Sequence, residues 1–173
     1  MPAQIRKRLE EMDAALTARL RIAESDGLLR KACALLAHSG DSWFWFAALG
    51  GVWAFGGAEW RSRALALIVS IFGTAVVVTV LKFTIRRPRP AGEWGTVYRI
   101  TDPHSFPSGH AARAMLLAVM GWHLGPVWFA AALTAWAPLV SVARIAMGVH
   151  YASDVLAGWV VGALMAAVFI AVF

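Results

Sequence analysis

Residues 114–143 read AMLLAVMGWHLGPVWFAAALTAWAPLVSVA and contain no Asp, Glu, Lys or Arg. A transmembrane helix needs about 20 mainly apolar residues, with a range of about 17–25, so this stretch is too long for one helix. Gly125-Pro126 lies inside it, and glycine is common after a helix whereas proline suits a first helical turn. The stretch therefore predicts two membrane helices, over 109–124 and 126–147, joined by a tight turn.

Three further segments are apolar and long enough to cross a bilayer, at 42–58, 64–81 and 155–173. Hydrophobic residues make up 60% of the 173-residue chain and charged residues 15%, whereas ordinary soluble domains are about a quarter charged. We therefore expect an all-α integral membrane bundle of about five transmembrane helices, because helices satisfy their own backbone in lipid. Gly158 and Gly162 have a spacing that lets helices approach closely, although lipid packing alone would also account for them.

The N-terminal part has a different pattern. In residues 3–25 apolar side chains recur every three or four positions, as in an amphipathic helix; they are Ile5, Leu9, Met12, Leu16 and Leu20. Such a helix either lies flat among lipid headgroups or packs on the domain as a solvated helix, and both arrangements stay open. Asp26-Gly27 ends the pattern, and a short half-apolar helix follows over 28–38. We therefore divide the chain into an amphipathic, interfacial segment, 1–40, and a membrane domain, 41–173. Acidic residues stand where a secretory signal would have its apolar core, so no such signal is expected.

The longest polar connection is 86–107, and its four prolines argue against a helix there. With five spans, this loop shares one face of the membrane with the N-terminus and with the loop near 148–152. The other face holds only the turns at 59–63 and Gly125 and the C-terminus. All polar clusters of the membrane domain then lie on one face.

Three clusters stand on that face: KFTIRRPRP at 82–90, FPSGH at 106–110 and RIAMGVHYASD at 144–154. Lys82, Arg89 and Arg144 are cations near span ends, and Arg binds phosphate bidentately while Lys acts as a point charge. Ser108-Gly109 precedes a helix, whose free backbone N–H groups favour an anion. These residues predict a phosphate site.

Two histidines and a carboxylate add reactive groups to these cations. His150 and Asp154 are four residues apart, so a near-helical backbone brings them together. A carboxylate on one imidazole nitrogen leaves the other nitrogen free to attack. His110 falls in the first turn of the helix after Ser108. The set suits phosphoryl transfer.

Each cluster also has a purely structural interpretation. Lys82 could reach the membrane surface from a helix end, and Ser108 could simply cap a helix. His150 and Asp154 could form a structural pair. Arg144 is harder to explain in this way, because a cation near a span end needs a polar or anionic partner.

In order and spacing the clusters resemble the type 2 phosphatidic acid phosphatase superfamily, whose pattern is K-x6-R-P, then P-S-G-H, then S-R-x5-H-x3-D. The resemblance covers roughly residues 40–173. The matching positions are Lys82, Arg89, Pro90, Pro107, Ser108, Gly109, His110, Arg144, His150 and Asp154. Ala143 departs from the pattern, since the family usually has Ser there, and the missing hydroxyl is expected to weaken one contact with phosphate.

The resemblance implies a metal-independent phosphatase. His150 would attack phosphorus and form a phosphohistidine, Asp154 would orient it, and His110 would protonate the leaving oxygen and then activate water. The transferring phosphoryl group would be bound by Lys82, Arg89, Ser108, Gly109 and Arg144. No metal or other cofactor is expected, and the sequence has no dense Asp/Glu/Cys ligand cluster.

The expected partners are a phosphorylated lipid and the membrane lipids, consistent with a formal charge of +6. We expect no nucleic acid, because the chain is too apolar to leave a solvated basic face. The string FPSGHAARA is similar to family members that act on isoprenoid phosphates, so a polyprenyl diphosphate such as the undecaprenyl carrier is the favoured substrate. The alternatives are a phosphatidic acid or phosphatidylglycerophosphate phosphatase and, from another class, a non-catalytic lipid-phosphate binder or transporter.

We expect a multi-pass protein of the cytoplasmic (inner) membrane. The positive-inside rule places the face with the three clusters in the cytoplasm. Relatives that recycle polyprenyl diphosphate mostly face outward, so the side stays open, as does the oligomeric state.

Overall fold

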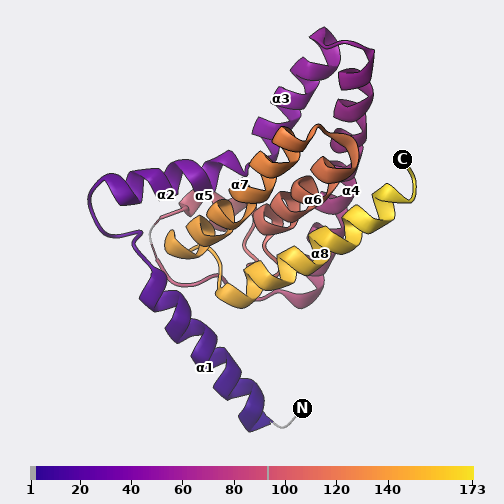
Figure 1. Cartoon of the computed structure of the whole chain (residues 1–173). Coiled ribbons are helices and arrows are strands. Elements are labelled where there is room, and N and C mark those ends of the chain that lie inside the picture. Colours follow the sequence, from indigo (N-terminus) through magenta and orange to yellow (C-terminus); the bar gives the residue numbers. More distant parts are fainter. Residues whose placement is uncertain (1–2, 93) are drawn as a thin grey trace.

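The computed structural model describes residues 3–92 and 94–173, so the first two residues of the segment 1–40 lie outside it. The described residues form eight helices and no strand (Figure 1). The helices are α1 (Ala3–Leu20), α2 (Leu28–Ser39), α3 (Ser42–Phe55), α4 (Ala58–Ile85), α5 (Thr96–Thr101), α6 (Gly109–Leu124), α7 (Val127–Ala146) and α8 (Ala152–Ile170). The expected all-α fold is confirmed.

The stretch 114–143 divides as predicted, with Gly125 and Pro126 between α6 and α7. By length and composition, α4, α7 and α8 can each cross a membrane. The other two predicted spans form shorter helices, with 14 residues in α3 and 16 in α6. Helix α4 is longer than the predicted 64–81, because its charged first turns are stabilised locally. Arg61 Nη2 donates to Ala54 O (3.0 Å), and Arg63 pairs with Glu59.

Two expectations for the polar segments are wrong. The segment 86–107 does contain a helix, α5, because its prolines lie before and after Thr96–Thr101 and not within it. Helix α1 ends at Leu20, short of residue 25. There the chain turns onto α7, where Ile22 N donates to Ala146 O (2.8 Å).

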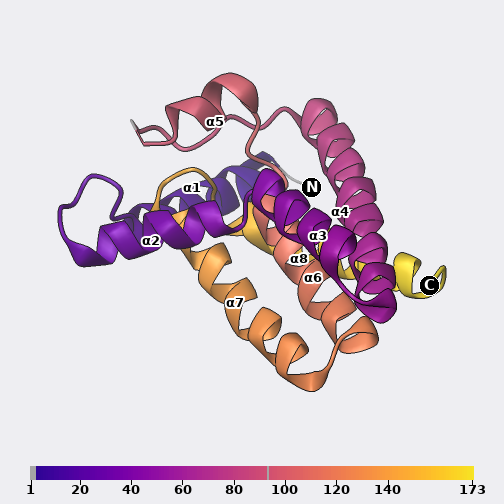
Figure 2. The ribbon, with the colours of Figure 1, turned by 90° about the horizontal axis from the view of Figure 1, so that it is seen from above.

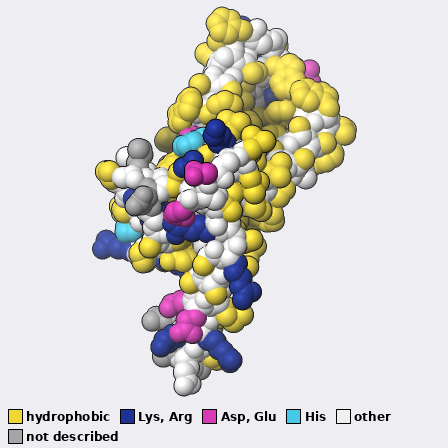
Figure 3. Space-filling view, turned by 90° about the vertical axis from the view of Figure 1, so that its left-hand side faces the viewer, with side chains coloured by type: hydrophobic (Ala, Val, Ile, Leu, Met, Phe, Trp, Pro, Cys, Tyr) yellow, Lys and Arg dark blue, Asp and Glu magenta, His cyan; other side chains and the backbone are white. Residues whose placement is uncertain are grey.

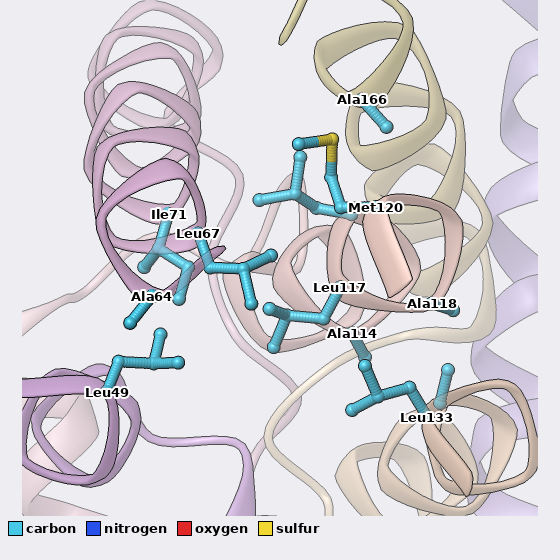
Figure 4. Packing of buried hydrophobic residues seen from close by; sticks show 12 residues of the cluster. Leu49, Ala64, Leu67, Ile71, Ala114, Leu117, Ala118, Met120, Leu133 and Ala166 are labelled. Carbon is cyan, nitrogen blue, oxygen red and sulfur yellow. The ribbon is translucent and has the colours of Figure 1, made fainter. Parts of the chain in front are cut away.

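Helix α6 lies at the centre of the bundle and packs against α4, α7 and α8 (Figures 1 and 2). Leu67 and Ile71 of α4 meet Leu117 and Met120 of α6 in the main hydrophobic cluster (Figure 4). Large apolar side chains also cover the outside of α4 and α8, including Phe72, Val80, Leu156, Val160 and Leu164. Such an apolar exterior fits helices that face lipid.

Two glycines bring α8 close to the beginning of α6. A Cβ atom on Gly158 would lie 2.5 Å from Ser108 O, and one on Gly162 would overlap Ala112 O. The close approach predicted for this pair is therefore confirmed. It places the backbone of the PSGH motif against the first two turns of α8.

Charged side chains are unevenly distributed over the surface. Figure 3 shows a largely hydrophobic upper end, built by α3 and α4, and charged side chains gathered at mid-height and over α1 at the lower end. This distribution fits a bundle whose hydrophobic part lies in lipid and whose charged part lies outside it.

Candidate active site

The three polar clusters meet where α4 ends, α6 begins and α7 turns into α8. Ser105 N donates to Arg87 O (2.8 Å), and Ser108 N donates to Asp154 O (2.9 Å). Arg89 Nη1 donates to Val149 O (2.7 Å). These bonds join all three clusters into one polar centre.

His150 lies in the connection between α7 and α8 and is almost fully buried. The chain reaches it through Gly148, whose φ of 65° is in the left-handed region that favours glycine. His150 Nε2 is 3.2 Å from Arg89 Nη1. Burial and the charges of Arg89, Arg144 and Lys82 hold the pKa of His150 well below its usual value. The imidazole is therefore neutral at neutral pH, with Nε2 facing the cations.

Asp154 lies close to His150, but its carboxylate is hydrogen-bonded to groups other than the imidazole. Oδ2 is 3.6 Å from His150 Nδ1, which is longer than a hydrogen bond. Oδ2 accepts from Tyr151 N (2.8 Å), and Oδ1 accepts from Arg87 Nη1 (2.7 Å). Tyr151 is extended, so the four-residue spacing spans a turn into α8 and not one helical turn.

Lys82 and Arg89 point into the same centre. Lys82 is buried and donates to His104 O (3.2 Å), so its ammonium is held inside the protein. Its ammonium also pairs with Asp102, which accepts from Arg89 Nη2 (2.9 Å) through the same oxygen, Oδ2. Burial lowers the pKa of Arg89 to about 10 against the opposing charge of Asp102, so Arg89 stays charged at neutral pH. No local pattern in the sequence predicts Asp102 at this position.

Arg144 is fully buried near the end of α7. Its guanidinium lies over the ring of Tyr98, 4.4 Å from the centroid. None of its three guanidinium nitrogens has a hydrogen-bond partner in residues 3–92 and 94–173. A buried, unpaired cation is costly, and this one has the five N–H donors that match phosphate oxygens.

Ser108 is the N-cap of α6, and its Oγ accepts from Ala111 N (3.4 Å). The predicted cap is confirmed, and the hydroxyl proton remains available to an anion beside Gly109. Ala143, by contrast, packs in an apolar cluster with Ala37 and Met147.

His110 is placed in the first turn of α6, and its Nε2 is 2.6 Å from Asp41 Oδ1. Asp41 was not among the predicted site residues. The available signal was an acidic residue directly before an apolar span, which also fits an ordinary helix cap. Burial would raise the pKa of Asp41, but hydrogen bonds from His110, His38 and Tyr98 outweigh it and hold that pKa well below its usual range. The Asp41 carboxylate is therefore ionised at neutral pH.

A cavity of about 280 Å³ opens beside these residues. Its polar end is lined by Lys82, Gly109 and His110, and its apolar end by Ile71 and Val78. The described residues contain no group of three or more His, Cys, Asp or Glu side chains that could hold a metal ion. Lys82, Arg89 and Arg144 bring positive charge to the site, and Arg113 also lines the cavity.

The sequence is similar to membrane phosphatases of known activity. The PAP2 superfamily model matches residues 63–173. The undecaprenyl-diphosphatase of Sulfolobus acidocaldarius is 33% identical over 106 residues, which are 59% of this chain and 51% of that protein. The chain therefore spans about half the length of this relative. The decaprenylphosphoryl-5-phosphoribose phosphatase of Mycolicibacterium smegmatis is 33% identical over 152 residues, covering 84% of this chain and 80% of that protein.

The fold is similar to two crystal structures. The LpxE structure of Aquifex aeolicus has a TM-score of 0.70 at 26% identity, with 91% of this chain and 93% of that chain covered. A transmembrane PAP2 type phosphatidylglycerolphosphate phosphatase from Bacillus subtilis has a TM-score of 0.76, with 95% and 86% covered. At 22% identity the second likeness concerns the fold alone. With the family model, the M. smegmatis relative and the membrane-helix bundle in agreement, this chain belongs to the PAP2 superfamily.

Proposed function

We propose that the protein is a membrane lipid phosphatase that releases phosphate from a phosphorylated lipid. The observation that carries the proposal is Arg144, a fully buried guanidinium with no hydrogen-bond partner in the described residues, near two further cations and a neutral histidine. An anionic oxygen ligand would satisfy Arg144, and a phosphoryl group suits its fork of donors. A binder would need only the cations, whereas His110 and His150 add a proton donor and a nucleophile.

The first half of the reaction transfers the phosphoryl group to His150. Nε2 attacks phosphorus as the bond from phosphorus to the lipid oxygen breaks, and His110 gives its proton to that oxygen. Lys82, Arg89, Arg144, Ser108 and the Gly109 N–H stabilise the charge on the transferring group, the contribution that usually dominates phosphoryl transfer. Asp154 stabilises the positive charge that develops on the imidazole of His150.

The second half releases phosphate. His110 takes a proton from water as the water oxygen bonds to phosphorus, and the bond from phosphorus to Nε2 breaks. The free enzyme is thereby restored. Three fixed cations supply the positive charge in this scheme, so we propose that the enzyme acts without a metal ion or other cofactor.

We propose a polyprenyl diphosphate as the substrate. The S. acidocaldarius relative is an undecaprenyl-diphosphatase, and the M. smegmatis relative acts on a decaprenylphosphoryl compound. The cavity beside His110 is lined by Lys82 and by apolar side chains of α4, among them Ile71 and Val78, which would suit the first part of an isoprenoid chain. We further propose a multi-pass protein of the cytoplasmic membrane.

We also propose that residues 1–40 form an interfacial segment and 41–173 the phosphatase domain. The apolar face of α1 is exposed, with Leu9, Met12 and Leu16 outward. The flank of that face docks through Asp13, which accepts from Arg87 Nη2 (2.8 Å) and Ser153 N (3.0 Å). A spin label at Met12 should collide with oxygen dissolved in lipid, and one at Lys7 with a water-soluble relaxant. Equal exposure of both labels to the water-soluble relaxant would contradict the interfacial placement.

The substrate is tested by phosphate release from purified protein against undecaprenyl diphosphate, phosphatidic acid and phosphatidylglycerophosphate. We expect the highest kcat/KM for the polyprenyl diphosphate, unchanged activity with a chelator, and inhibition by vanadate. A preference for a glycerophospholipid would overturn the substrate but not the chemistry. Activity that a chelator removes would overturn the metal-free mechanism.

A further inference from the structure

Asp41 stands at the N-cap position of α3, yet its carboxylate makes no cap hydrogen bond. Oδ1 instead lies 2.6 Å from His110 Nε2 and accepts from Tyr98 OH (2.9 Å). Oδ2 lies 3.1 Å from His38 Nδ1 and accepts from Trp43 Nε1 (3.3 Å). The ordinary reason for an Asp before a helix is a cap, and that reason does not apply here.

The backbone on both sides of Asp41 is held against α6. Arg113, one turn beyond His110, donates to Gly40 O and to Ser42 Oγ. A Cβ atom on Gly40 would lie 2.9 Å from Val140 Cγ1 and 3.0 Å from His110 Cδ2. The α2–α3 junction is therefore packed so closely on His110 that only glycine fits at position 40, and Asp41 has a defined place beside the ring.

His110 needs such a partner because, among the described residues, the other charges that act on it are those of cations. The charges of Arg113 and Arg144 act on it, and Lys82 lines the same cavity. These charges disfavour a protonated imidazole, whereas a general acid must carry its proton before the transfer. Asp41 is the carboxylate in hydrogen-bond contact with the ring. Tyr98 and His38, the remaining titratable groups of this network, bond to Asp41.

We propose that Asp41 is the positioning residue of His110, holding the ring through Nε2 and stabilising its protonated form, so that Nδ1 exchanges the proton with the substrate. The proposal rests on the phosphatase function, in which His110 is the acid and then the base. In the first step the Nδ1 proton goes to the leaving oxygen, which keeps the electron pair of the broken phosphorus–oxygen bond. In the second step Nδ1 takes the proton of the attacking water.

The test compares two leaving groups in a single turnover. A prenyl alcohol or prenyl phosphate leaves slowly without a proton, whereas p-nitrophenolate leaves readily without one. We expect Asp41→Asn, which keeps the shape but removes the charge, to slow release of the prenyl group by about tenfold to a thousandfold, the range for a general acid. Release of p-nitrophenolate in the first turnover should change by less than about threefold, and KM should change little.

Asp26→Asn is the matched control, because it makes the same chemical change at an exposed position and should leave both rates unchanged. Equal losses on both leaving groups in Asp41→Asn would overturn the proposal, since a protein that is merely misfolded loses both. Gly40→Ala, which pushes the α2–α3 junction away from His110, should show the same leaving-group selectivity.

A double-mutant cycle separates this proposal from the proposed function. In a His110→Ala background, Asp41→Asn should cause less than about a further twofold loss, because a residue acting through His110 has nothing left to position. Losses that multiply would overturn the role of Asp41 while leaving the phosphatase intact. A wild-type protein that releases no phosphate from any lipid phosphate would instead overturn the proposed function itself.

Discussion

Arg144 combines a full charge, complete burial and no hydrogen-bond partner in the described part of the chain. A residue that serves stability alone would not remain in this state, because replacing a buried charge by an apolar side chain is often neutral or stabilising, by about 1–4 kcal/mol. We expect Arg144→Met to keep or raise the Tm of the solubilised protein while kcat/KM falls by about a hundredfold or more.

Arg144→Lys is the companion variant, and it should not restore activity, because an ammonium lacks the bidentate fork. Vanadate should raise the Tm of the wild type but not that of Arg144→Met. A large loss of Tm with activity retained would show that Arg144 is structural.

The pH dependence of kcat/KM is expected to follow from the ionisation of His150. Its neutral form is the nucleophile and is lost as the pH falls through its pKa, which burial and three cations hold well below the usual value. We therefore expect the acid limb of kcat/KM to lie well below pH ~6.5, the ordinary histidine value. Arg89→Met removes one of these cations, so the pKa of His150 should rise and the acid limb of kcat/KM should move to higher pH. Both proteins are measured on the same substrate, so that the ionisation of the substrate affects both profiles equally. A limb that does not move, or that moves to lower pH, would contradict this assignment.

At the scale of residues, the sequence predicts the positions of the motif residues but not the carboxylates that hold them in place. The predicted site residues lie at one centre because each stands at a helix end or in the adjoining loop, on the same side of the bundle. Asp41 and Asp102 have no such signal, since their contacts join residues far apart in the chain and depend on the finished fold. The distance from His150 to Asp154 also depends on the turn into α8, which four-residue spacing alone does not specify.

At the scale of elements, the contact between α6 and α8 fixes the position of the PSGH motif. Gly162→Ala would place a methyl group against the backbone oxygen of Ala112, and overpacking of this kind costs about 1–3 kcal/mol. We expect a lower Tm and lower activity, because Ser108 moves away from Asp154. Gly50→Ala in α3 is the control, since nothing lies within 4 Å of its added Cβ. It should leave the activity unchanged, and an equal loss of Tm in both variants would contradict the packing argument.

Helix boundaries were predictable where apolar runs meet glycine, proline or a capping serine, as at both ends of α6. They were not predictable where charged residues continue a helix, as in the first turns of α4. Helix α5 was missed because it has only 6 residues and depends on tertiary contacts. Tyr98 lies over Arg144, and Arg99 Nη1 donates to Pro90 O (2.6 Å).

At the scale of the whole molecule, the proposed passage of α4 through the membrane would place its two ends on opposite sides. Cysteines introduced at Lys7, Glu59 and Thr96, each in a Cys33→Ser background, should label with an impermeant maleimide in two classes. The cysteines at positions 7 and 96 should react with the maleimide from the same side of the membrane. The cysteine at position 59 should react from the other side. Labelling of all three from the same side would contradict the multi-pass arrangement, and the class that reacts from outside reports the side of the active face.

In the proposed mechanism His150 carries the phosphoryl group, and trapping this covalent intermediate tests that role. Purified wild-type protein and His150→Ala, matched in amount and in Tm, are given a radiolabelled lipid phosphate, quenched within one turnover and assayed for protein-bound and released phosphate. We expect an acid-labile phosphohistidine and steady phosphate release for the wild type, and neither for a folded His150→Ala protein. Undiminished phosphate release by His150→Ala would contradict it.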